Sequence, residues 1–101
     1  MAASRPPSDP MLLLLISLAG GPKHGHAMLH DVEAFAGVRL GPGTLYGALA
    51  RLEEAGLVKP LEPEGRRRPY RLTDAGAAAL TARLDGLASA VETGLDRVGA
   101  R

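Results

Sequence analysis

The stretch from Gly41 to Val58, GPGTLYGALARLEEAGLV, decides the fold because it predicts one helix with a defined start and end. Pro42 fits the first helical position, where a missing N–H does no harm, and Gly56 supplies the left-handed residue that commonly ends a helix. At about 100° per residue the apolar residues fall on one side, which must pack against a core. That side consists of Leu45, Ala48, Leu49, Leu52 and Ala55.

The opposite side of this helix is nearly bare of side chains at its start, because Gly43, Gly47 and Ala50 fall there. A thin helix can approach another surface closely, and the N–H groups and positive dipole end at its start favour a phosphate. The margins of the bare side carry Thr44, Tyr46 and Arg51. An ordinary amphipathic helix with incidental glycines is the alternative that the helix alone leaves open.

The composition describes one small domain with an aliphatic core and argues against an enzyme. The 101 residues include three aromatic side chains, Phe35, Tyr46 and Tyr70, and neither tryptophan nor cysteine. The lack of cysteine excludes disulfides, thiol catalysis and cysteine-ligated metals, and it fits a cytoplasmic protein. The sequence has no convergent set of histidine and carboxylate and no glycine loop that cradles phosphate, so we expect neither catalysis nor a cofactor.

Positive charge is concentrated directly after the helix that begins near Gly41. The net charge of the whole chain is only +1, but residues 59–71 carry five basic and two acidic side chains. A local basic patch of this kind indicates a polyanionic partner more strongly than the overall balance does.

The N-terminal part predicts an arm followed by a buried helix. Residues 1–9 are polar and contain prolines, so we expect a flexible arm that could touch a partner through Arg5. The run from Met11 to Ala19 is apolar almost all round, and we expect a subunit interface to bury it. This run loosely resembles a secretory signal, but Asp9 and Pro10 before it are typical of a helix start. It is also far shorter than the roughly 20 residues that span a bilayer, so we expect a buried helix.

The second predicted helix begins near His24 or Gly25, ends at Gly37 and brings two histidines close together. His26 and His30 have the i, i+4 spacing that can place two imidazoles on one metal ion. The sequence offers no evident third ligand, since Asp31 points away from the pair. It therefore favours capping and surface histidines over a native metal site, and metal analysis of untagged protein distinguishes the two.

The region after Gly56 predicts a two-stranded hairpin. Leu57 to Glu62 is typical of one short strand and Arg68 to Leu72 of a second, with the turn at residues 63–67 between them. Prolines in both strands cannot donate ladder hydrogen bonds, so each must lie at an edge or face outward. The arginines of the turn and the returning strand, Arg66, Arg67 and Arg68, lie where they can reach phosphates.

The last segment, residues 73–101, predicts one long helix with a single apolar stripe. Thr73 is the expected N-cap, and Asp74 suits the first turn. The stripe consists of Leu80, Leu84, Leu87, Val91, Leu95 and Val98. A helix of this length extends further than the small body can cover, so the stripe needs a second chain, most simply its own copy in a two-fold dimer. Its glycines predict fraying near the end.

The order helix, helix, turn, helix and basic hairpin is that of a winged helix-turn-helix in residues 10–72, followed by a dimerisation helix. Four segments carry a more specific likeness: Gly21-Pro22 with His24-Gly25, GPGTLY at residues 41–46, RLEEAGL at 51–57, and GRRRPYRLTDAG at 65–76. Over roughly residues 11–80 the chain resembles the PadR family of bacterial transcriptional regulators, in its compact subgroup with a single short C-terminal helix.

This resemblance implies a homodimeric regulator that binds double-stranded DNA at a palindromic operator. Such regulators are usually repressors that a small effector releases, and the aliphatic surfaces between the first and last helices imply a hydrophobic one. With the third helix in the major groove, half-sites lie about one helical turn apart. We expect DNA contacts from Gly43, Thr44, Tyr46, Gly47, Arg51, Arg66, Arg67 and Arg68.

Other interpretations of these residues remain open in the sequence. The arginines also suit a solvated turn, and Tyr46 suits core packing, because its angle lies near the edge of the apolar side. A winged helix used only for protein association, with its last helix on a foreign partner and no effector, is the second function. That module should stay monomeric when alone.

Overall fold

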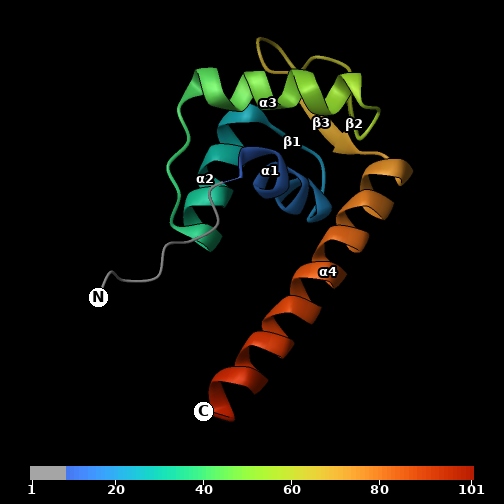
Figure 1. Cartoon of the computed structure of the whole chain (residues 1–101). Coiled ribbons are helices and arrows are strands. Elements are labelled where there is room, and N and C mark those ends of the chain that lie inside the picture. Colours follow the sequence, from blue (N-terminus) through green and yellow to red (C-terminus); the bar gives the residue numbers. More distant parts are fainter. Residues whose placement is uncertain (1–8) are drawn as a thin grey trace.

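The computed structural model describes residues 9–101, so the predicted arm lies outside the described residues apart from Asp9. The elements are α1 (Pro10–Ala19), β1 (Lys23–His24), α2 (Gly25–Ala36), α3 (Pro42–Glu54), β2 (Val58–Pro60), β3 (Pro69–Leu72) and α4 (Asp74–Gly99). The fold is mainly helical, with a small antiparallel sheet and a long last helix, as expected. Helices α1 to α3 and the sheet form one body, from which α4 extends outward (Figure 1).

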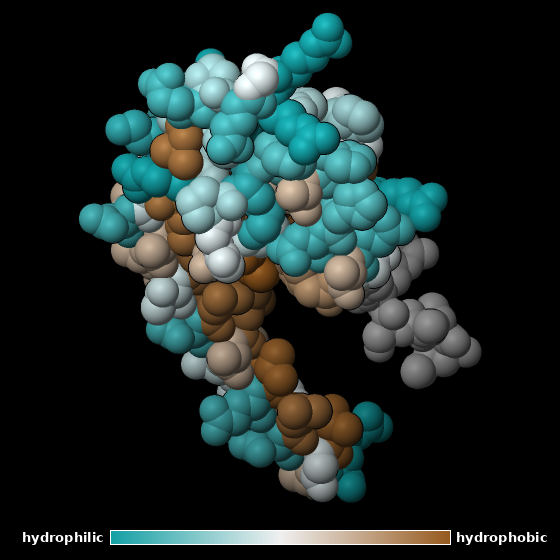
Figure 2. Space-filling model, turned by 180° about the vertical axis from the view of Figure 1, so that it is seen from behind, coloured by the Kyte–Doolittle hydropathy of each residue, from teal (hydrophilic) through white to brown (hydrophobic). Residues whose placement is uncertain are grey.

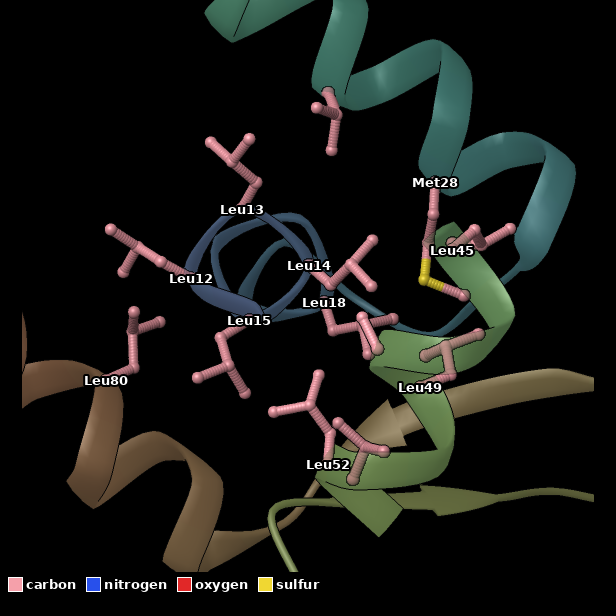
Figure 3. Packing of buried hydrophobic residues seen from close by; sticks show 13 residues of the cluster. Leu12, Leu13, Leu14, Leu15, Leu18, Met28, Leu45, Leu49, Leu52 and Leu80 are labelled. Carbon is pink, nitrogen blue, oxygen red and sulfur yellow. The ribbon is translucent and has the colours of Figure 1, made fainter. Parts of the chain in front are cut away.

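Helix α1 is the centre of that body rather than part of a subunit interface. Its side chains at Leu13 and Leu14 are 1% and 0% exposed within the single chain. Leu12 lies toward Leu80 of α4, Leu14 toward Met28 of α2, and Leu18 toward Leu49 of α3 (Figure 3). The prediction that a second chain buries this helix is therefore wrong, because α2, α3 and α4 surround it and an all-round apolar helix suits a domain centre equally well.

Helices α2 and α3 form the helix-turn-helix at the predicted positions. Gly37 ends α2 in the left-handed conformation with φ 67°, and Gly56 follows α3 with φ 76°. The apolar side of α3 is confirmed as core at Ala48 and at the three leucines Leu45, Leu49 and Leu52, which are at most 1% exposed. The prediction is wrong for Ala55, because the helix ends one residue earlier and Ala55 is its exposed C-cap.

The sheet has three strands instead of the predicted two, in the order β1-β3-β2. Lys23 of β1 pairs with Tyr70 of β3, and Val58 of β2 pairs with Leu72 on the other side. The restriction to a hairpin is thus wrong, because the two residues of β1 become a strand only by pairing with β3. Pro69 accordingly opens the central strand instead of lying at an edge, and the first position of a strand tolerates proline.

Backbone and side-chain hydrogen bonds fix the start of α4 against the end of α3. Thr73 caps α4 as predicted, because its Oγ1 accepts the Gly76 N–H at 3.0 Å. The same hydroxyl donates to the Gly56 carbonyl at 2.7 Å, and the Thr73 N–H donates to the Leu57 carbonyl at 3.1 Å. Gly76 lies directly on this junction, where an added Cβ would overlap the Leu57 carbonyl oxygen and come within 2.8 Å of Leu72 Cδ1.

The apolar stripe of α4 is divided between the chain's own core and the surface. Leu80 is 5% exposed and packs in the core with α1, so it does not belong to the free part of the stripe (Figure 3). Beyond it the stripe is increasingly exposed, from 41% at Leu84 to 69% at Leu95. These side chains form a continuous apolar band along the helix (Figure 2). The helix continues to Gly99.

Within residues 9–101, every helix is either too short or too polar to cross a membrane.

Candidate nucleic-acid interface

Helix α3 and the loop that joins β2 to β3, the wing, lie on the same side of the body, and the free end of α4 points away from it (Figure 1). The outer surface of α3 is exposed at Gly43, Gly47 and Ala50, as the sequence predicts. Within the described part of the chain, a Cβ added at either glycine would meet nothing within 4 Å. The domain's own packing therefore does not require these glycines, and the space above them is free for an external surface.

Tyr46 lies on the wing side of this bare surface and is partly packed and partly exposed. Its side chain is 56% exposed. The ring nevertheless covers the start of α2, because a Cβ added at Gly25 would lie 2.8 Å from the Tyr46 hydroxyl oxygen. The hydroxyl end of Tyr46 thus packs on a glycine of its own domain, while more than half of the side chain stays exposed beside the wing.

The wing and the start of α2 enclose a basic hollow, which we call the wing hollow. It has a volume of about 320 Å³ and is lined by His24, Gly25, His26, Tyr46, Arg66, Arg67, Arg68 and Tyr70. The three predicted arginines and Tyr46 are therefore brought together as neighbours. The histidines and Tyr70 were missed as site residues, although two histidines beside the helix-starting glycine were a local signal. Burial, with the carboxylate of Glu53, raises the pKa of Tyr70, which keeps its hydroxyl protonated as a donor.

Hydrogen-bond donors converge inside the wing hollow. His24 caps α2, and its Nδ1 accepts the Ala27 N–H at 3.3 Å. A neutral ring with this acceptor carries its proton on Nε2. That Nε2 lies 3.4 Å from Nη1 of Arg67, so two donors face each other. An anionic oxygen beside both nitrogens could accept from each, which is the arrangement that favours a phosphate oxygen.

Thr44 and Arg51 lie on the other margin of α3, away from the wing. They line a second hollow of about 320 Å³ between α3 and the start of α1, together with Asp9, Pro10, Met11, Gly43, Gly47 and Ala48. The eight predicted DNA-contacting residues thus divide between two margins of one exposed face.

Asp9, which lines the second hollow, connects the start of α1 to α4. Its carboxylate accepts the N–H of Met11 at 3.1 Å as the cap of α1 and lies 2.8 Å from Nη2 of Arg83 on α4. Burial raises the pKa of Asp9, but these hydrogen bonds outweigh it and leave the pKa below its usual value. The carboxylate is thereby ionised and neutralised by Arg83, which limits its repulsion of a nearby phosphate.

The histidine pair on α2 is close but short of ligands. His26 Nε2 and His30 Nε2 are 3.1 Å apart. Among residues 9–101, no group of three histidine, aspartate or glutamate side chains is placed to hold a metal ion. Asp31, the nearest acid in the sequence, instead accepts the Ser17 hydroxyl at 2.7 Å.

Residues 12–82, which include the whole helix-turn-helix and the wing, match the Transcriptional regulator PadR-like family. The chain belongs to this family. The matched residues are therefore those of a transcriptional-regulator family, and the resemblance seen in the sequence is confirmed.

The relatives of this PadR-like chain include longer proteins. It is 55% identical over 73 residues to a 37.1 kDa protein of transposon TN4556 from Streptomyces fradiae, covering 72% of this chain and 21% of that protein. It is 41% identical over 70 residues to the transcriptional activator GvpE2 of Halobacterium salinarum, covering 69% of this chain and 35% of GvpE2. The chain thus spans about a fifth and a third of these two relatives.

A PadR family transcription regulator from Clostridium difficile has a similar fold. The two structures align with a TM-score of 0.77 at 22% identity, over 85% of this chain and 94% of the other. At that identity the likeness supports the winged-helix fold and the long last helix, and no detail of the interface.

Proposed function

We propose that this PadR-like regulator binds double-stranded DNA sequence-specifically as a homodimer, in the cytoplasm, and represses transcription from the site it occupies. The observation that carries the proposal is the meeting of two features on one face. A helix without side chains at its outer surface lies beside a hollow in which arginine, histidine and tyrosine donors converge. The first feature suits entry into a groove, and the second suits the phosphates that border it.

The geometry suggests a division of roles among the predicted residues. Gly43 and Gly47 allow the α3 backbone to approach the major groove closely. Thr44, Tyr46 and Arg51, on the two margins, are in position for base edges and nearby phosphates. Arg66, Arg67 and Arg68 hold the flanking backbone, which contributes affinity more than sequence choice.

A selection of bound duplexes from random-sequence DNA tests this function. Two copies of α3 related by a two-fold axis should enrich inverted half-sites whose centres lie about 10 base pairs apart, or a multiple of that spacing. Enrichment of a single unrepeated motif would contradict the dimeric arrangement. Failure to enrich any motif would contradict sequence-specific binding itself.

The exposed stripe of α4 supports the homodimer. Five large apolar side chains, Leu84, Leu87, Val91, Leu95 and Val98, are between 41% and 69% exposed on a helix that projects beyond the body (Figure 1). A continuous apolar band of this kind is rarely left in water by a stable protein. A second copy offers the same band, so a two-fold pairing of α4 covers both at once.

Charge placed in this stripe should separate the dimer. We expect Val91→Asp with Leu95→Asp to yield a monomer in sedimentation, because each buried carboxylate costs about 3 kcal/mol or more in an apolar interface, or about a hundredfold in the dissociation constant. Ser89→Asp, on the opposite side of the same helix, is the matched control and should leave the dimer intact. A wild-type chain that is monomeric at all accessible concentrations would instead favour the protein-association module.

Repression needs only occupancy of a promoter, which this DNA-binding unit can provide. A small hydrophobic effector, bound between α1 and α4 near the dimer axis, is the proposed means of release, and the aliphatic side chains of both helices support it. One relative, GvpE2, is named a transcriptional activator, so whether this protein represses or activates transcription has to be measured. A reporter driven by the selected site should fall in expression when the protein is present, and a rise would show activation.

A further inference from the structure

The histidine pair of α2 has the separation of a bidentate metal chelate. Zinc binds imidazole nitrogen at about 2.0–2.1 Å, so two nitrogens on one ion are about 2.9–3.4 Å apart for bond angles between square and tetrahedral. His26 Nε2 and His30 Nε2 are 3.1 Å apart, inside this range. Their rings come from consecutive turns of one helix and meet edge to face, with centroids 4.6 Å apart.

The surroundings of the pair leave the chelating nitrogens accessible. Both histidines are exposed, and they line an open hollow of about 150 Å³ with Leu29, Glu33, Arg39 and Leu40. Glu33, one turn beyond His30, is held by Arg39, whose Nε and Nη2 lie 3.2 and 3.0 Å from its Oε1. The site therefore has two ligands of its own and open positions for water or another donor.

The pair also borders the wing hollow, because His26 lines both hollows. An ion on this pair would add positive charge beside Arg66, Arg67 and Arg68. His26 thereby brings this pair to the edge of the region in which the proposed function places a DNA phosphate.

We propose that His26 and His30 chelate one divalent transition-metal ion per chain, and that the bound ion strengthens DNA binding. Imidazole ligands favour zinc, nickel and copper over magnesium or calcium. In the structure the two Nε2 atoms are hydrogen-bonded to each other, so one of them carries a proton. Metal binding through both requires that this ring carry its proton on Nδ1 instead, which leaves both Nε2 lone pairs for the ion. The second half of this inference rests on the proposed function, whereas the first half does not.

Titration calorimetry of untagged protein with nickel chloride tests the site without DNA. Wild type should bind one ion per chain, and His30→Gln should weaken binding by at least about tenfold, since losing a direct ligand should cost no less than losing a supporting contact. His24→Asn is the matched control, because asparagine still caps α2 and both ligands remain. Equal binding by wild type and His30→Gln, or an equal loss in His24→Asn, would overturn the assignment.

A second titration tests the link to DNA. At saturating nickel the affinity of wild type for its selected site should rise about fivefold or more over that in equimolar magnesium, the scale typical of coupled sites. His30→Gln should show no rise, although its affinity without nickel stays unchanged because His30 lies outside the wing hollow. An unchanged wild-type affinity would overturn the coupling. A chain that binds nickel but no specific DNA would contradict the proposed function and leave the metal site supported.

Discussion

Replacement of Gly76 by alanine is expected to destabilise the fold by about 3 kcal/mol or more. The added methyl group would overlap the Leu57 carbonyl oxygen, which is backbone and already accepts the Thr73 N–H. Relief requires α4 to move away from the end of α3, which breaks the Thr73 contacts on both sides. Thermal unfolding followed by circular dichroism should show a melting temperature lower by about 10–20 °C.

Gly86→Ala is the matched control on the same helix. Within the described chain, a Cβ at Gly86 meets nothing within 4 Å, so the change removes only the entropic disadvantage of glycine. We expect a gain of about 0.5–1 kcal/mol. Opposite signs for the two substitutions would support the close junction at Gly76. A tolerated Gly76→Ala, with a melting temperature equal to wild type, would contradict the position of α4.

Replacement of Arg66, Arg67 and Arg68 together by alanine is expected to weaken DNA binding about a hundredfold at 150 mM salt. Each phosphate contact contributes about 0.9 to the slope of log affinity against log salt, so losing three should flatten that slope by up to about 2.7. The wing hollow gathers these side chains beside α3, which is why they should act on the same DNA. Fluorescence anisotropy over a salt series measures both effects.

A second triple variant separates location from net charge. Arg39, Arg97 and Arg101 to alanine removes the same charge from exposed positions outside the wing hollow. We expect an affinity within a few fold of wild type and a nearly unchanged slope. Arg39 is already paired with Glu33, and Arg97 and Arg101 lie at the C-terminal end of the chain, which points away from α3 and the wing, so their charges are largely screened from the DNA. If both triple variants lose affinity equally, the wing has no special part in binding.

The helices could be predicted because their limits are set by local residues. Asp9 and Thr73 cap the helices that follow them, and Gly37 and Gly56 take the left-handed conformation that ends a helix. The apolar side of α3 follows from the helical period alone. These signals act over a few residues, so the sequence displays them directly.

The features that were missed depend on contacts between distant residues. Strand β1 exists only through its pairing with β3, and two residues carry no periodic pattern. The place of α1 at the centre, and of Leu80 in the core, follows from how the helices pack around each other. In an isolated apolar stripe, residues that face the chain's own core look the same as residues that face another chain.

In the candidate site, too, the local features could be predicted and the features that depend on distant contacts could not. The bare surface of α3 and the arginine cluster could be predicted, because each lies in one short segment. The arrangement of Thr44 and Arg51 on the margin away from the wing could not, since it depends on where α1 and the wing pack against α3. His24 belongs to the site because its ring lies beside the guanidinium group of Arg67, which is 43 residues further along the chain.

The measurement that tests the central claim most directly is fluorescence anisotropy of the wild-type protein with its selected duplex and with a scrambled duplex, across a salt series. DNA recognition by α3 and the wing predicts binding to the selected duplex at least about a thousandfold tighter than to the scrambled one at physiological salt, with a steep salt dependence for both. Equal and weak binding to the two duplexes at that salt concentration would contradict sequence-specific recognition by this face.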